Sequence, residues 1–349
     1  MSPSSQSHIL LHVALATMGL LMSCCLTARM RRYAIATQLL DRPNERSSHS
    51  VPTPRGGGLA IVTSFLLIIL GLNLASPIAL PLFAAILGSG LLVAALGFVD
   101  DRSGLPARWR FLGHAAAAAW VLAWMGPLPP VPILGLTINL GFGAVLLSAF
   151  YLVWSINLFN FMDGIDGIAS LEAIGVSLSG ALVWWLVQPT GDWPVAVLFA
   201  ACVSGFLYWN FPPARIFMGD AGSGFLGLIV ALLALWSSRT APHLFWSWFI
   251  LGGCFMVDAT TTLVRRVRRG ESFHVAHRSH AYQYAARRHA SHKVVTLTVL
   301  AINTVWLTPL AVLVAVRLLD GVAGVLIAYA PLLWLALHYK AGDRAAQEP

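Results

Sequence analysis

The sequence predicts an all-α protein, a polytopic transmembrane bundle of about 11 helices that forms a single domain over residues 1–349. Composition is the first reason: 58% of the residues are hydrophobic and 10% are charged, against roughly 45–50% and about 25% in soluble domains. So little charge cannot cover a water-facing surface, and the high hydrophobicity excludes a disordered chain. The second reason is that the apolar residues gather in runs close to the ~20 residues that cross a bilayer.

These apolar runs are separated by loops containing proline, glycine and charge, as at Pro189–Asp192, Pro212–Pro213 and Asp320–Gly321. The first run follows a segment without Lys or Arg, so we interpret it as a retained span rather than a signal peptide. The fourth run is short for a span. The predicted spans are 8–28, 56–75, 78–98, 112–126, 139–159, 168–188, 194–210, 222–238, 243–264, 294–316 and 321–338.

The positive residues predict the orientation of this bundle. Of the 22 Lys and Arg residues, all but Arg239 and Arg317 lie in loops after odd-numbered spans or in the C-terminal tail. Because cytoplasmic loops carry an excess of positive charge, we expect the N-terminus outside and the C-terminus in the cytoplasm. The predicted cytoplasmic loops are about 29–55, 99–111, 160–167, 211–221 and 265–293.

Five aspartates lie at the predicted cytoplasmic ends of helices: Asp100, Asp101, Asp163, Asp166 and Asp220. Acids beside a membrane are costly, and they are usually paired, bound to metal or functional. Few basic residues stand close to these five in the sequence, which favours a divalent-cation or substrate site over ordinary solvated loop acids. A hard cation such as Mg²⁺ takes oxygen ligands and keeps waters and substrate phosphates in its shell.

The segment from Asn157 to Gly167 carries the strongest signal. Asn157, Asn160 and Asp163 recur every three residues, which places them on one helical face as the predicted fifth span ends. Gly164 and Gly167 allow a turn and a close approach of the backbone. Carboxamides beside carboxylates in an apolar helix are costly unless a polar ligand uses them. A polar helix cap is the alternative.

Two glycine-bearing segments suit a bound phosphate. Asp220 is followed by small residues through Gly224 at the start of a span, where exposed N–H groups attract anions. Small-residue packing between membrane helices is the alternative for these glycines. His49 and Arg55 precede three glycines before the second span, a weaker signal because basic loops beside spans are mostly topological anchors.

The last predicted cytoplasmic loop combines four arginines within 265–269 with His274, His277 and His280. The histidine spacing alone is not enough to predict zinc, because no cysteine stands nearby. Clustered arginines suit anionic lipid head groups or phosphates, and a plain topological anchor is the alternative for them. Histidines anchor poorly when they are neutral.

In these residues the chain resembles the polyprenyl-phosphate N-acetylhexosamine-1-phosphate transferases of glycosyltransferase family 4. The resemblance covers nearly the whole chain in motif order: a Pro-Arg-Gly-Gly-Gly loop, Val99-Asp100-Asp101, Asn157 to Gly167, Met218 to Ser223 and a histidine-bearing last loop. It implies an Mg²⁺-dependent enzyme, with Mn²⁺ as a substitute. In this reaction polyprenyl phosphate attacks the sugar-linked phosphate of a UDP-N-acetylhexosamine, giving polyprenyl-diphospho-sugar and UMP.

The resemblance also implies roles for individual residues. It makes Asp220 and Asn157 metal ligands, and Asp100 with Asp101 the catalytic residues that act on the lipid phosphate. The residues that it places around the substrates are His49, Asn157, Asn160, Asp163, Asp166, His277, Arg278 and His280. The expected partners are the polyprenyl phosphate lipid, the UDP-amino sugar and membrane lipids of the bacterial inner membrane, but no nucleic acid. A homodimer stays open.

Two departures bear on the substrate. The muramoyl-pentapeptide enzymes of the family carry three consecutive histidines in the last loop, where this chain has His277-Arg278-Ser279-His280. They also carry a lysine near the position of His49. Both differences favour the branch that initiates O-antigen, lipopolysaccharide or other surface glycans. A phospho-N-acetylmuramoyl-pentapeptide transferase is the alternative within the family.

A secondary transporter is the alternative from a different class. Transporters place ion and substrate groups near the bilayer midplane, whereas the only acids inside the predicted spans, Glu172 and Asp258, lie near span ends. For the transferase, the acceptor phosphate has a second pKa of about 6 and is mostly dianionic at neutral pH. We therefore expect Asp100 to position the nucleophile or the metal rather than to remove a proton.

Overall fold

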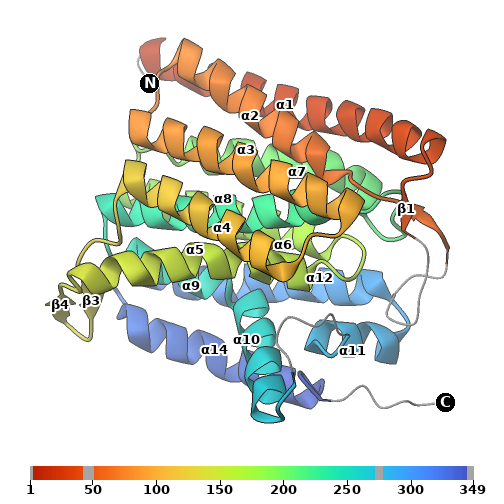
Figure 1. The fold of residues 1–349 in the computed structure, drawn as a ribbon. Helices are drawn as coiled ribbons and strands as arrows, with labels where there is room; N and C mark the ends of the chain where they lie inside the picture. The colour runs from red at the N-terminus through yellow and green to blue at the C-terminus, as the bar shows by residue number, and fades with distance from the viewer. Residues whose placement is uncertain (1–2, 42–50, 272–277, 344–349) are drawn as a thin grey trace.

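The computed structural model describes residues 3–41, 51–271 and 278–343, with side chains from residue 7 onward. It is a bundle of helices with two short antiparallel strand pairs (Figure 1). The strands are β1 (Leu40–Asp41) paired with β2 (Thr53–Pro54), and β3 (Val131–Ile133) paired with β4 (Leu136–Ile138). The helices are α1 (Pro3–Ala36), α2 (Gly58–Ala75), α3 (Leu80–Ser103), α4 (Ala107–Met125), α5 (Phe142–Met162), α6 (Ile168–Val187), α7 (Pro194–Asn210), α8 (Asp220–Thr240), α9 (Leu244–Leu251), α10 (Gly253–Arg268), α11 (Ala281–His289), α12 (His292–Ile302), the π-helix η1 (Asn303–Leu307), α13 (Thr308–Ala315) and α14 (Gly321–His338).

The predicted all-α membrane class is confirmed. Within the described residues, eight helices are long and apolar enough to cross a bilayer, or up to nine if α9 and α10 form one bent span. Each of the eleven predicted ranges overlaps a helix, but α7 has only 17 residues and α4 is not among the eight. The number of crossings and the orientation of the termini therefore stay predictions.

Helix α8 lies at the centre of the bundle. Within the 18-residue apolar stretch of each helix, 94% of the residues are buried in α8, against 17% in α1. Helix α8 packs closely on α3 and α5, and glycines allow this approach. A Cβ on Gly97 would lie 2.5 Å from the backbone of Ala221, and one on Gly222 would lie 2.6 Å from the Cα of Gly58. This close contact favours small-residue packing for Gly222, the alternative considered for the glycines of that segment.

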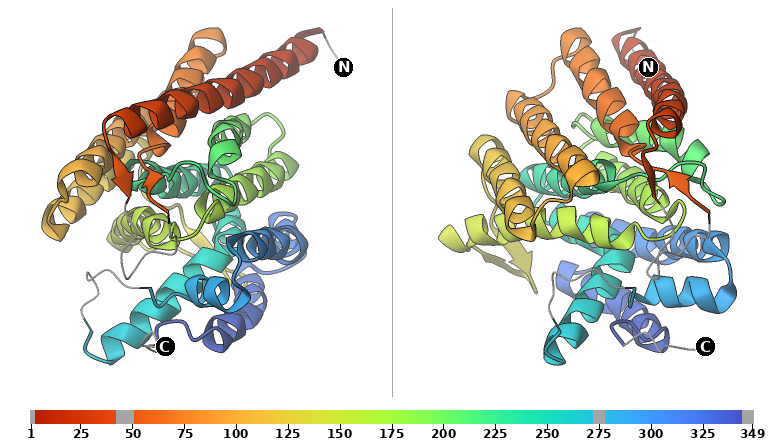
Figure 2. Two further views of the ribbon diagram at one scale, coloured as in Figure 1. Left: turned by 90° about the vertical axis from the view of Figure 1, so that its right-hand side faces the viewer. Right: turned by 45° about the vertical axis from the view of Figure 1, so that its right-hand side comes forward.

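The predicted span 243–264 is broken rather than continuous. Helices α9 and α10 meet at an angle of 69°, so that α10 runs across the direction of its neighbours (Figure 2). The break lies at Gly252 and Gly253, and a Cβ on Gly253 would lie 2.9 Å from the ring of Tyr329 on α14. Beyond the break, α10 carries polar residues from Asp258 to Arg268. Because the first half of the range is strongly apolar, its average hydropathy does not show that the second half is polar.

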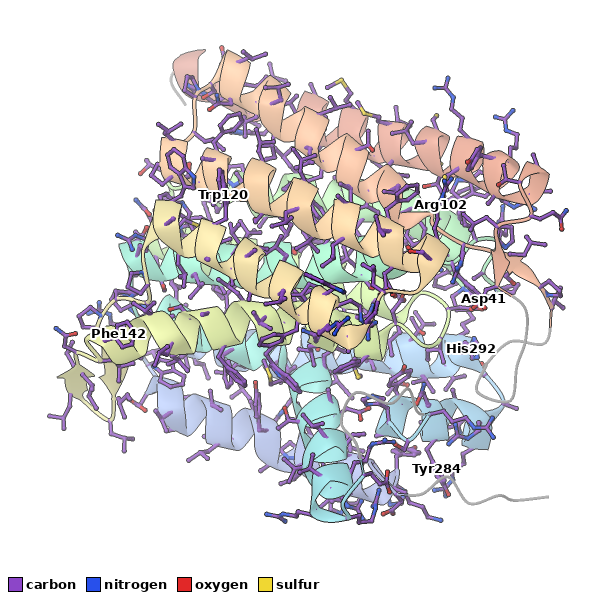
Figure 3. The ribbon with its side chains drawn as sticks, viewed as in Figure 1. Asp41, Arg102, Trp120, Phe142, Tyr284 and His292 are labelled. Carbon is purple, nitrogen blue, oxygen red and sulfur yellow. The ribbon has the colours of Figure 1, made fainter. Side chains whose placement is uncertain are left out.

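The two ends of the bundle differ. Figure 3 places Arg102 and His292 toward one end, and Trp120 and Phe142 toward the other. The end near Arg102 is where α3 and α5 finish and where α8 begins, as hydrogen bonds between these helices show. The motifs at the ends of three predicted spans therefore meet at one place.

Candidate active site

The acid-rich end of the bundle is built around the first turn of α8. Asp101, near the end of α3, accepts hydrogen bonds from the backbone N–H groups of Asp220 (3.1 Å) and Ala221 (3.3 Å). A carboxylate here satisfies N–H groups that a helix leaves unpaired and is attracted by the helix dipole. Gly219 has a φ of +80°, and a Cβ on it would lie 2.6 Å from Asp101 Oδ2. This geometry favours a positioning role for Asp101 over direct contact with substrate.

The Asp220 side chain is held from α5. Asn160 donates a 2.7 Å hydrogen bond from Nδ2 to Asp220 Oδ1, and the same nitrogen lies 3.2 Å from Ser223 Oγ. The carboxylates of Asp100 and Asp101 also lie close enough to Asp220 to repel its negative charge. The structure thus brings together the two motifs that the sequence places at the ends of the fifth and seventh predicted spans.

Asp100 faces the beginning of α4. Its Oδ1 accepts a 2.6 Å hydrogen bond from the N–H of Leu105, and its Oδ2 forms a 3.1 Å ion pair with Arg110. Both carboxylate oxygens are therefore already engaged by donors. This arrangement supports the expectation that Asp100 orients other groups rather than removing a proton.

A cavity of about 320 Å³ opens beside these residues. Its polar end is formed by Asp100, Arg110, His114, Asn157, Asn160 and Asp220. Its walls are largely apolar and include the aromatic side chains of Phe111, Phe150, Trp154 and Phe161. A cavity with one charged end and aromatic walls suits a ligand that joins a phosphate to a hydrocarbon chain.

Arg110 and His114 line this cavity but were not predicted as site residues. They stand four residues apart, so they share one face of α4, and that spacing at the start of the fourth predicted span was the available signal. His114 Nδ1 lies 3.3 Å from Asn157 Nδ2, which also donates to the Val153 carbonyl at 2.7 Å. Both contacts use the nitrogen of Asn157. Its carboxamide oxygen, the atom that would bind a metal, has no donor among the described residues.

Asp163 directly follows α5, and its side chain accepts no hydrogen bond from the described residues. Burial raises the pKa of this carboxyl well above its ordinary value, and the nearby charges of Asp220, Asp101 and Asp166 raise it further. A carboxyl in this setting either keeps its proton or gains from a cation. A nearby cation would therefore stabilise the ionised form of Asp163.

No three His, Cys, Asp or Glu side chains within the described ranges form a ready-made metal site. Mg²⁺ does not need such a site, because it binds through one or two carboxylates together with waters and substrate phosphates. The donors present fit this cation. The predicted ligands that would hold it are the Asp220 carboxylate and the Asn157 carboxamide oxygen, both at the polar end of the cavity. The carboxylate of Asp163 is a third oxygen donor close to Asp220.

Asp166 lies beside the cluster but faces another cavity, of about 500 Å³, lined also by Pro212, Pro213 and His292. Its Oδ2 accepts a 3.0 Å hydrogen bond from the N–H of Ala214 and lies 3.3 Å from His292 Nδ1. Asp166 therefore connects the turn after α5 with α12. Its predicted role in substrate binding stays a prediction.

Asp258, which had no predicted role, organises the start of α11. It accepts 2.9 Å hydrogen bonds from the N–H groups of Ala281 and Tyr282, and His280 Nδ1 lies 3.3 Å from its Oδ1. His280 is 3% exposed and does not line the 320 Å³ cavity. The sequence could not reveal this cap, because its two halves are separated by the last loop.

Tyr282 connects α11 to the acid cluster. Its hydroxyl donates a 3.0 Å hydrogen bond to the carbonyl of Phe161, and a Cβ on Gly164 would overlap that hydroxyl. The close approach predicted at Gly164 is confirmed, as is the turn at Gly167, where φ is +74°. The start of α11 is thus fixed against the end of α5.

Three predicted residues of the first and last cytoplasmic loops remain. His49 and His277 lie outside the described residues, so their roles stay predictions. Arg278 is half-buried, and its carbonyl accepts a 3.3 Å hydrogen bond from Arg287.

Comparisons with known proteins identify the family of the chain. Residues 83–238 match the family model described as glycosyl transferase family 4. The chain is 30% identical over 300 residues to the probable undecaprenyl-phosphate N-acetylglucosaminyl 1-phosphate transferase of Bacillus subtilis (strain 168), covering 82% of this chain and 81% of that protein.

Two further relatives are named for different substrates. The decaprenyl-phosphate N-acetylglucosaminephosphotransferase of Mycobacterium tuberculosis (strain ATCC 25618 / H37Rv) is 30% identical over 308 residues, covering 78% of this chain and 75% of that protein. The phospho-N-acetylmuramoyl-pentapeptide-transferase of Moorella thermoacetica is 34% identical over 233 residues, covering 62% and 69%. The chain therefore belongs to the polyprenyl-phosphate N-acetylhexosamine-1-phosphate transferase family.

Proposed function

We propose that the protein transfers an N-acetylhexosamine-1-phosphate group from a UDP-sugar to a polyprenyl phosphate, at the cytoplasmic face of the bacterial inner membrane, with release of UMP. The observation that supports this most directly is the 320 Å³ cavity, which joins Asp220, Asp100 and Arg110 to aromatic walls. The phosphate of the acceptor lipid would lie at the polar end, and its first isoprenoid units along the walls.

In the proposed reaction an oxygen of the lipid phosphate forms a bond to the sugar-linked phosphorus, and the bond from that phosphorus to UMP breaks. Phosphoryl transfer depends mostly on positioning and charge neutralisation. Arg110 and His114 are placed to bind the lipid phosphate, and Asp100 orients Arg110 through the 3.1 Å ion pair. When bound, Mg²⁺ offsets negative charge on the diphosphate and the leaving UMP.

The proposed donor is a UDP-N-acetylhexosamine, and the proposed product initiates O-antigen or another surface glycan. The Bacillus and Mycobacterium relatives are named for N-acetylglucosamine phosphate transfer. The last loop, with Arg278 and Ser279 between His277 and His280, also differs from the three histidines of the muramoyl enzymes. A muramoyl-pentapeptide donor is the second candidate, because one relative of 34% identity carries that name.

The test is a reconstitution in detergent or liposomes with purified protein, undecaprenyl phosphate and Mg²⁺. The donor panel comprises UDP-N-acetylglucosamine, UDP-linked deoxy-amino sugars and UDP-N-acetylmuramoyl-pentapeptide, with UMP release and lipid-linked product as readouts. We expect turnover with a simple UDP-amino sugar. Turnover with the pentapeptide donor alone would select the second candidate, and no turnover with any donor would contradict the proposed function.

A further inference from the structure

The residues that follow α14 are bound to α10 and to the start of α11. Arg265 on α10 donates from Nη1 to the carbonyl of Ala341 (2.7 Å) and from Nη2 to Asp343 Oδ1 (2.6 Å). The N–H of Gly342 donates a 2.6 Å hydrogen bond to the carbonyl of Ser279. One short segment therefore contacts both sides of the last loop.

Arg269 completes this set of contacts. Its guanidinium donates to the carbonyl of Gly342, lies 3.6 Å from Asp343 Oδ1 and donates a 3.0 Å hydrogen bond to Glu271. Two of the four arginines thus bind the C-terminal segment and Glu271. These contacts give Arg265 and Arg269 a structural role that the sequence did not suggest, and the lipid-phosphate and anchor roles considered for the four arginines stay predictions.

The segment fits its place closely. Ala341 is fully buried. Gly342 has a φ of +74°, and a Cβ on it would lie 2.8 Å from the carbonyl oxygen of Thr262 and 3.0 Å from Arg265 Cβ. Any other residue at position 342 would push the segment away from α10 and from Ser279. We call Ala341, Gly342 and Asp343, together with Arg265 and Arg269, the C-terminal clamp.

A continuous set of contacts leads from the clamp to the acid cluster. Ser279, bound by Gly342, directly precedes His280, and Asp258 caps the helix that begins there. Tyr282, the second residue of α11, is hydrogen-bonded to the carbonyl of Phe161 at the end of α5. A displacement of Gly342 would therefore move the beginning of α11 relative to Asp163 and Asp220.

We propose that the C-terminal clamp is a positioning element of the transfer reaction, which sets the place of residues 278–282 against the acid cluster. The proposal rests on the proposed function. The clamp residues do not line the 320 Å³ cavity, so we expect them to act through Ser279 and the start of α11. Disturbing them should lower kcat more than it raises KM for the UDP-sugar or the lipid.

The test compares Gly342→Ala with Gly270→Ala. Both glycines have a φ of +74°, but a Cβ on Gly270 would meet nothing within 4 Å. The two variants therefore share the backbone strain, and only Gly342→Ala disturbs the clamp. We expect kcat to fall by roughly tenfold or more in Gly342→Ala, since small misplacements of reacting groups have large effects on rate. Gly270→Ala should stay within about twofold of the wild type by the same reasoning.

Asp343 supplies the second pair of variants. Asp343→Ala should lower kcat, and Asp343→Glu, which keeps the charge for Arg265, should restore most of it. Hydrogen exchange of the Ala281 and Tyr282 amides, both bound by Asp258, reports on the same segment without any substrate. It should become faster in Gly342→Ala and in Asp343→Ala, but not in Gly270→Ala.

Equal kcat in Gly342→Ala and Gly270→Ala would overturn the proposal, as would equal exchange at residues 281 and 282. If the wild type turns over none of the donors, the proposed function fails, and the exchange comparison alone decides whether the clamp holds α11. A fall in kcat with unchanged exchange would also contradict the clamp, because the effect would then not pass through the start of α11.

Discussion

The first turns of helices α8 and α11 are each capped by an aspartate that belongs to another helix. Asp101 of α3 binds the first N–H groups of α8, and Asp258 of α10 binds those of α11. The two carboxylates are equally buried, each residue being 6% exposed. Their surroundings differ: Asp101 stands among the carboxylates of Asp100, Asp163 and Asp220, whereas Asp258 faces the imidazole of His280.

The two helix starts differ in whether the acidic side chains around the capping aspartate have partners among the described residues. At α11 the cap has its own partner in His280, and the contacts of Tyr282 fix it to α5. At α8 the cap leaves Asp163 without a hydrogen bond from the described residues and surrounded by like charge. The same local arrangement is therefore part of the scaffold at α11, whereas at α8 it lies beside the carboxylates that we propose as the cation site.

The largest effect is expected at α8 itself. Asp220→Asn should lower turnover by roughly 10²- to 10³-fold, the range seen when one group that stabilises developing charge is lost, and should weaken the Mg²⁺ dependence. The measurement is UMP release against Mg²⁺ concentration. Asp192→Asn is the control. Asp192 lies in the loop between α6 and α7, away from the proposed metal site, and accepts a hydrogen bond from Trp236 of α8. Near-normal turnover with an unchanged Mg²⁺ titration would remove Asp220 from the metal site.

Asp100→Asn should have the next largest effect, a loss of about 10²-fold that is similar at every pH. The variant loses the ion pair with Arg110, and a positioning loss of this kind is not repaired by hydroxide. The measurement is the pH profile of kcat between about pH 7 and 9, where the acceptor phosphate is mostly dianionic. Full recovery of the variant at high pH would instead identify Asp100 as a general base.

The two caps can be compared directly by Asp101→Ala and Asp258→Ala. Each should destabilise the protein by about 1–2 kcal/mol, the upper range for loss of a helix cap, visible as an earlier thermal transition of Trp fluorescence in detergent. Only Asp101→Ala should also weaken Mg²⁺ activation. If both variants changed the Mg²⁺ titration equally, the distinction between scaffold and binding site would fail.

The smallest predicted effect is on stability as a function of pH. Because the pKa of Asp163 is raised above its ordinary 3.8 in the folded protein, its neutral form is favoured there, and this contribution to stability is full below that value. As pH rises from about 4 toward the raised pKa, the unfolded chain loses its proton first, so metal-free stability falls.

Asp163→Asn should remove this fall, and saturating Mg²⁺ should reduce it in the wild type. Thermal unfolding with EDTA and with Mg²⁺ from about pH 4 to 8 measures both effects, over a range that starts at the ordinary carboxyl pKa. If thermal stability in EDTA depended on pH in the same way in wild type and variant, ionisation of Asp163 would not be the cause of the fall in stability.

Much of this architecture could be predicted from hydropathy, because burial in lipid demands long apolar runs. The meeting of Asp101, Asn160 and Asp220 also followed from the parity of the predicted loops. The break at Gly252 did not, although the glycine pair and the polar residues after Asp258 were visible. A hydropathy average over the range masks a change of direction.

The remaining site residues depend on tertiary contacts that no local pattern encodes. Asp258 finds its partners 23 and 24 residues later in the chain, and the partners of Arg265 lie beyond α14. Arg110 lies in the predicted loop 99–111 and His114 in the short predicted span 112–126, and neither stretch carried a recognised motif. In each case the missing information was which helices become neighbours, not which residue types are present.

The enclosure of α8 has a consequence for the enzyme in its membrane. Helix α8 is surrounded by protein along 94% of its apolar core, whereas α1 is buried along only 17%. A change in bilayer thickness acts on surfaces that touch lipid, by tilting helices or drawing in flanking residues. Thinner or thicker bilayers should therefore tilt α1 well before they displace Asp220, so that turnover should vary little between lipid mixtures of different chain length.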